Sequence, residues 1–339
     1  MKIDNMMSIL LSFLGLVLTT ECLSIPIAEK FDVRSPTAAK CPFVPSGPLP
    51  DLPSELPVNL TNVFKIMDNF IDNSTNEENI PSIVAGIAYR GEIIHSHGAG
   101  VINKTAINKT TPTIDTQYRI GSVSKIFPVL QSYMGQDSGL FSLDDSLASV
   151  GNNKLSFVNP YGKQQQPSLR ELCSQRAGLP REAPCDRPLL CNSTNSEMTK
   201  RINQKTVLIQ EPGGIPSYSN MAYSLLGHEL TPANTIWEDW VQTSILDPLE
   251  MKGTGFGLAL DVENANVAVG YHPNGAAVGT YSLGWNMPCG GMRSTIRDLS
   301  TIAGAIMSES NPLIHSRSLA QELVAPVSVD NGGNTLFGM

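Results

Sequence analysis

The chain has 339 residues, of which 41% are hydrophobic, and a formal net charge of -8 at pH 7. A chain of this length and apolar content can form one large domain with its own hydrophobic core. Nucleic-acid phosphates are bound by clustered lysines and arginines, so the acidic balance and the lack of a long basic run argue against nucleic acid as a partner.

The N-terminus has the pattern of a secretory signal peptide. Met1-Lys2 precedes an apolar run from Met6 to Leu18, and Cys22-Leu23-Ser24 suits a cleavage site. That run is short for a bilayer, and no later segment approaches the roughly 18 apolar residues that a spanning helix needs. We therefore expect a signal peptide at residues 1–24 and a mature chain without a membrane span, secreted or in the lumen of the secretory pathway. A signal anchor in the membrane is the alternative.

Residues 25–57 contain eight of the 24 prolines, which favours an extended linker ahead of the domain. We take the domain itself as residues 58–339. Five Asn-x-Ser/Thr sequons are consistent with N-glycosylation in a secretory route. They begin at Asn59, Asn73, Asn103, Asn108 and Asn192.

The next segments predict a fold class. The extended runs Ile83–Tyr89 and Glu92–His97 flank Arg90-Gly91 and predict a β-hairpin. Helical patterns dominate from Ile126 to about Leu246, and extended, Gly-rich sequence returns at residues 268–283. This order predicts an α+β domain with an antiparallel sheet and an inserted, mostly helical subdomain.

Histidines give little support for a metal site. His95 and His97 would face the same side of a strand. However, a His-x-His-x-Asp site needs an aspartate where Ala99 stands, and His228-Glu229 lacks the second histidine of His-Glu-x-x-His. We therefore expect neither a metal nor another cofactor.

Ser122 and Lys125 form the only Ser-x-x-Lys in the chain, at the start of a stretch expected to be helical from Val123 to Met134. A serine hydroxyl is a poor nucleophile at neutral pH and needs a nearby base and a stabilised oxyanion. Residues i and i+3 share a helical face, so Lys125 can reach Ser122. The motif predicts a nucleophile and its base, although an N-cap and an exposed lysine would have the same sequence.

Tyr218 and Asn220 form a second motif, Tyr-x-Asn, between the turn-rich segment Glu211–Pro216 and a helix-like run. Both side chains are expected to project from a loop into a cleft. Tyr218 could relay the Ser122 proton, and Asn220 could hold Lys125 with its oxygen and a substrate amide with its nitrogen. A half-buried turn tyrosine and an N-cap asparagine are the alternative.

Removal of a signal peptide with Cys22 would leave five cysteines, so at least one would be unpaired. Cys185 and Cys191 bracket a short loop that a disulfide could close for roughly 2 kcal/mol. Cys173 is a rival partner for either of them. Cys41 and Cys289 complete the set.

Five segments, in order along the chain, resemble conserved segments of one enzyme family. They are Tyr118–Lys125, Gly139–Asp145, Ser168–Pro180, Leu246–Phe256 and Cys289–Leu299. The family is the serine β-lactamase-like family, in the branch of class C β-lactamases and D-alanyl-D-alanine carboxypeptidases that uses Tyr-x-Asn. The resemblance extends from about Asn79 to Phe337, and it is strongest to animal secreted β-lactamase-like proteins.

The resemblance implies a β-lactamase/transpeptidase-like fold of the penicillin-binding-protein type. It also implies a serine hydrolase in which Ser122, Lys125, Tyr218 and Asn220 act on a small molecule or peptide with an amide, ester or peptide carbonyl. The family's third motif, Lys-Thr-Gly or His-x-Gly, has no match, so we expect the C-terminal strands to be missing. Two alternatives stay open: an inactive binding or assembly module, and a non-functional truncated isoform.

Overall fold

The structure is a computed structural model. It describes residues 51–77, 80–107, 109–161, 166–186, 191–257, 266–279, 282–308, 310–329 and 336–337. The expected signal peptide, the linker up to residue 50 and the sequon at Asn108 lie outside these residues. Contacts divide the chain into two units, Met1–Met67 and Asp68–Met339, and the boundary falls within helix α2, Val58–Glu77. All of the features below belong to the second unit.

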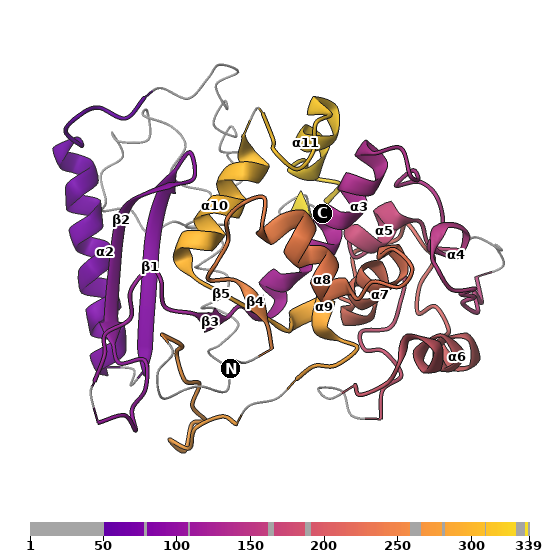
Figure 1. Ribbon diagram of the computed structural model, residues 1–339, viewed down its shortest axis with the longest axis horizontal. Helices are drawn as coiled ribbons and strands as arrows, with labels where there is room; N and C mark the ends of the chain where they lie inside the picture. The colour runs from indigo at the N-terminus through magenta and orange to yellow at the C-terminus, as the bar shows by residue number, and fades with distance from the viewer. Residues whose placement is uncertain are drawn as a thin grey trace, which may run out of the picture. The chain divides into compact units, whose positions relative to one another are not determined.

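The expected hairpin is confirmed as strands β1, Ser82–Tyr89, and β2, Glu92–Gly100, which pair antiparallel. Its two turn residues, Arg90 and Gly91, have φ angles of 54° and 85°. Two consecutive positive φ angles define the turn whose twist matches the twist of the strands. Helix α10, Ile296–Met307, lies against both strands (Figure 1).

The other strands are short. Strands β3, Tyr118–Arg119, β5, Met292–Ser294, and β4, Gly255–Phe256, form a three-stranded antiparallel sheet in the order β3-β5-β4. Strands β6, Ser328–Val329, and β7, Leu336–Phe337, form an antiparallel pair. The α+β class with antiparallel pairing is confirmed, as small separate sheets in the part of the chain that the structure describes.

The expectation of extended structure at residues 268–283 is wrong in its described part. That part forms one isolated bridge, between Tyr271 and Ala277, and no named strand. The turn between these two residues contains Pro273, Asn274 and Gly275, which are turn-forming residues that interrupt a regular strand.

The helical subdomain is confirmed, and its elements pack around one apolar core. Helices α3 and α7 contact each other at its centre, and Phe127, Tyr133 and Trp237 are fully buried there. The elements are α3, Ile126–Asp137, α4, Leu147–Val150, α5, Leu169–Cys173, α6, Asn195–Lys205, α7, Asn220–Leu230, α8, Trp237–Val241, the π-helix η3, Gln242–Leu246, α9, Met287–Gly290, and α11, Arg317–Leu323. Among the described residues, no helix is both long and apolar enough to cross a bilayer.

The helix expected from Val123 begins differently. A 3-10 helix, η2, covers Gly121–Lys125, and α3 starts at Ile126. In a 3-10 helix, residues three apart are eclipsed, so their side chains align more closely than in an α-helix. This change of helix type places the side chains of Ser122 and Lys125 on one edge of η2.

Gly178 lies in a turn that is fixed to the segment ahead of α7. Its carbonyl accepts a hydrogen bond from the Ile209 N–H at 2.8 Å, and its φ is +69°. A Cβ at this position would lie 2.2 Å from the carbonyl oxygen of Gln210, which is a backbone atom.

Gly178→Ala is therefore expected to lower the free energy of unfolding by about 2 kcal/mol or more, because a left-handed backbone and a steric overlap coincide. Thermal denaturation measures the effect. Gly279→Ala is the matched control, since a Cβ there would meet no atom within 4 Å. Equal melting of the Gly178 variant and the control would show that the turn adjusts without cost.

Candidate active site

Ser122 lies at an exposed position at the start of η2. The preceding backbone is fixed by a hydrogen bond from the Ile120 N–H to the Met292 carbonyl at 3.1 Å. Gly121 then turns the chain with a φ of +49°, a conformation that favours glycine. The Val123 N–H donates to the Ile120 carbonyl at 3.1 Å, so the N–H of Ser122 itself is the group expected to face an oxyanion beside the serine.

Lys125 is buried, at 7% relative exposure, and its ammonium group donates three hydrogen bonds. The acceptors are the Ser122 Oγ at 3.2 Å, the Asn220 Oδ1 at 2.8 Å and the Cys289 carbonyl at 2.6 Å. An ammonium group has three donors, so this set of acceptors uses all of them. Lys125 is thereby aimed at the serine hydroxyl.

Tyr218 approaches the serine from the loop that precedes α7. Its hydroxyl lies 2.5 Å from the Ser122 Oγ, and the Lys125 Nζ lies 4.7 Å from the centre of its ring. The Arg181 guanidinium lies 4.8 Å from the same ring centre. The hydroxyl of Tyr218 is thereby held against the Ser122 Oγ, and its ring is held beside two cations.

Asn220 is the first residue of α7, and Ser219 is the N-cap whose hydroxyl accepts from the Ala222 N–H at 3.1 Å. The expectation that Asn220 lies in the loop is therefore off by one residue. Its side-chain oxygen still meets Lys125, from which it accepts a hydrogen bond at 2.8 Å. The structure thus brings Ser122, Lys125, Tyr218 and Asn220 together by direct hydrogen bonds.

Ser124, the neighbouring serine, is fully buried. Its hydroxyl oxygen accepts a hydrogen bond from the Met292 N–H at 3.2 Å. It therefore holds β5 against η2 and is not accessible to a substrate.

Arg181 and Glu182 were not identified from the sequence. Both follow Pro180 in a loop that contacts the start of α7, and the Glu182 Oε1 accepts a hydrogen bond from the Asn220 Nδ2 at 2.8 Å. Glu182 and Asn220 are 38 positions apart, so only the folded chain shows their contact. The one available signal was their place directly after the Ser168–Pro180 segment.

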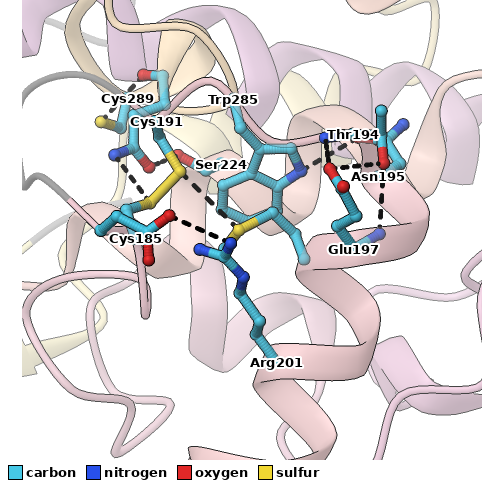
Figure 2. Close-up of a disulfide and its surroundings, with 12 residues drawn as sticks. Cys185, Cys191, Thr194, Asn195, Glu197, Arg201, Ser224, Trp285 and Cys289 are labelled. Atoms are coloured by element: carbon cyan, nitrogen blue, oxygen red, sulfur yellow. Dashed lines mark hydrogen bonds and ion pairs between the residues drawn. A yellow bond between two sulfur atoms is a disulfide. The ribbon is translucent and has the colours of Figure 1, made fainter.

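The disulfide considered from the sequence is present between Cys185 and Cys191. Figure 2 shows it beside Cys289 and Trp285. The backbone N–H of Trp285 donates to the Cys191 carbonyl at 2.8 Å. Cys173, the rival partner, is a free and buried thiol whose pKa is raised to about 12 by burial. Cys289 is also free, and burial raises its pKa, so both thiols are neutral at physiological pH.

The histidines considered as metal ligands have other partners. His95 and His97 each lie 2.8 Å from a carboxylate oxygen, of Asp68 and Asp72 respectively. His228 bonds the Trp285 carbonyl at 2.7 Å, and burial lowers its pKa to about 4, so it is uncharged at neutral pH. In the described part of the chain, no three His, Cys, Asp or Glu side chains are arranged to hold a metal ion.

The fold and these motifs agree with comparisons to known proteins. A model of the β-lactamase family matches residues 67–336. The chain therefore belongs to the β-lactamase family, whose members are serine hydrolases, and the family expected from the five segments is confirmed.

Two relatives show the extent of the similarity. Beta-lactamase-like protein 2 of Dictyostelium discoideum is 32% identical over 302 residues, which cover 85% of this chain and 54% of that protein. A human β-lactamase-like protein is 33% identical over 294 residues, which cover 85% of this chain and 57% of that protein. The chain thus spans about half the length of these relatives.

A solved structure supports the fold. The β-lactamase/D-alanine carboxypeptidase from Yersinia pestis superposes with a TM-score of 0.63 at 21% identity, over 83% of this chain and 81% of that one. At this level of identity the similarity concerns the fold alone.

Proposed function

We propose that the chain is a serine hydrolase that cleaves an amide, ester or peptide bond through an acyl-enzyme on Ser122. One observation carries the proposal. The exposed Ser122 hydroxyl lies within hydrogen-bond distance of both an ammonium and a phenol, at 3.2 Å from the Lys125 Nζ and 2.5 Å from the Tyr218 hydroxyl. A nucleophile within reach of two proton-transfer groups is the arrangement that covalent acyl transfer needs.

In the first step, the Ser122 Oγ forms a bond to the substrate carbonyl carbon. Its proton passes to the Tyr218 oxygen, and in the same step the Tyr218 hydroxyl proton passes to the leaving nitrogen or oxygen, whose bond to the carbonyl carbon breaks. That transfer is direct or runs through the Lys125 ammonium, which takes up the proton as it gives up one of its own. A backbone N–H at the start of η2 stabilises the negative charge on the carbonyl oxygen. Water then attacks the acyl-enzyme by the reverse path, releases the acid and restores the Ser122 hydroxyl.

Asn220 has a separate role in this proposal. Its oxygen accepts from Lys125 at 2.8 Å and so keeps the ammonium directed at Ser122. One of its two Nδ2 hydrogens is left for a carbonyl oxygen of the substrate, since only the other is used by Glu182. A substrate with an amide group beside the scissile bond fits this donor.

Covalent labelling of the purified chain tests the proposal. A fluorophosphonate reporter forms a stable adduct with an activated serine, a β-lactam reporter forms an acyl-enzyme with it, and hydrolysis of amide and ester substrates is followed in parallel. We expect labelling of the wild type and of Ser196→Ala, an exposed serine on α6, and none of Ser122→Ala. A folded wild-type chain that neither labels nor hydrolyses any of these compounds would favour an inactive binding module.

A further inference from the structure

The loop that carries Glu182 is fixed to the first turn of α7 by backbone hydrogen bonds. The N–H groups of Asn220 and Met221 both donate to the Arg181 carbonyl, at 2.7 Å and 3.3 Å. The Ser219 hydroxyl donates to the Pro180 carbonyl at 2.7 Å. These bonds satisfy N–H groups that a helix start would otherwise leave unpaired, so they hold Glu182 at a defined position beside Asn220.

The Asn220 amide lies between two opposite charges. Its oxygen accepts from the Lys125 ammonium at 2.8 Å, and its nitrogen donates to the Glu182 carboxylate at 2.8 Å. Rotation of the amide by 180° would place its nitrogen against the ammonium and its oxygen against the carboxylate. Both contacts would then be repulsive, because each would pair two donors or two acceptors.

Glu182 is itself held in place. Its Oε1 lies 3.4 Å from the Arg181 Nε, and its side chain is 37% exposed. The same Arg181 guanidinium lies over the Tyr218 ring, at 4.8 Å from its centre. One loop therefore contacts Asn220 through a carboxylate and Tyr218 through a cation.

We propose that Glu182 is a positioning residue that fixes the orientation of the Asn220 amide. It acts through Asn220 and not on the reacting atoms, and the inference rests on the proposed function. With Glu182 present, the Asn220 oxygen faces Lys125 whether the lysine carries a proton or has given it up. Without it, one of the two charged contacts that set the orientation is lost, and an amide turned by 180° would present its oxygen, an acceptor, to the substrate carbonyl.

Acylation rates with the β-lactam and fluorophosphonate reporters test this role. Glu182→Leu is expected to lower both rates about tenfold, the scale of one hydrogen bond to a charged group at a partly exposed site. Glu182→Gln keeps an acceptor oxygen and is expected to stay within about threefold of the wild type. Glu92→Leu, which removes an exposed carboxylate from β2, is the control and should leave both rates unchanged.

A double variant that exchanges the hydrogen-bond donor and acceptor between positions 182 and 220 gives the sharper test. Asn220→Asp places a second carboxylate against Glu182 while keeping an oxygen for Lys125, so acylation should fall. Adding Glu182→Gln to that variant supplies an amide donor, and the double variant should acylate at least tenfold faster than Asn220→Asp alone. This rescue is readable even where Glu182→Leu fails to fold.

The outcomes separate the two proposals. A wild type that takes no label overturns the proposed function and this inference with it. A labelled wild type overturns the positioning role alone if a folded Glu182→Leu acylates at the wild-type rate, or if Glu182→Gln gives no rescue of Asn220→Asp.

Discussion

Lys125→Ala is expected to lower the rate of Ser122 acylation by about 10²-fold or more, the usual scale for a positioned proton-transfer group. The variant removes the ammonium that lies 3.2 Å from the Ser122 Oγ. It also leaves the half-buried Asn220 oxygen and the buried Cys289 carbonyl without their donor, and the buried carbonyl alone costs about 1–3 kcal/mol of stability. The rate is therefore measured below the melting transition of the variant.

Lys252→Ala is the control for this experiment, because Lys252 is an exposed lysine. It should acylate at the wild-type rate. A folded Lys125→Ala variant that also did so would exclude the lysine from proton transfer.

Tyr218→Phe is expected to lower acylation by a similar factor, about 10²-fold, with little change in stability. The substitution removes one oxygen atom, which lies 2.5 Å from the Ser122 Oγ, and keeps the ring that contacts Lys125 and Arg181. Because the side chain is 38% exposed, loss of its hydroxyl leaves no buried group unpaired.

Tyr161→Phe, at an exposed tyrosine, serves as the matched control and should have no effect. The free energies of unfolding of both variants, measured by thermal denaturation, should lie within about 1 kcal/mol of the wild-type value. Wild-type acylation by Tyr218→Phe would assign the proton relay to Lys125 alone.

Local chemistry accounts for the features that could be predicted from the sequence. The hairpin follows from two extended runs around Arg90-Gly91, and the Ser122 to Lys125 contact follows from a spacing of three residues at a helix start. The short Cys185–Cys191 loop allowed the disulfide, although the sequence alone could not exclude Cys173. Each of these depends on residues that are close in the chain.

The features that the sequence did not predict depend on contacts between distant segments. Glu182 meets Asn220 only because the loop after α5 caps α7, and no periodicity reports that approach. The same holds for the Cys289 carbonyl, which reaches Lys125 from a segment 164 residues away. In the described part of residues 268–283, the sequence looks extended but no named strand forms, and one isolated bridge joins Tyr271 to Ala277.

The most direct test of the central claim is the location of the covalent adduct. The reporter-labelled chain is digested, and tandem mass spectrometry identifies the modified residue in the peptide that contains both Ser122 and Ser124. We predict an adduct on Ser122, which is exposed and bonded to Lys125 and Tyr218, and none on the fully buried Ser124. An adduct on Ser124, or one that persists in Ser122→Ala, would contradict the assignment of Ser122 as the nucleophile.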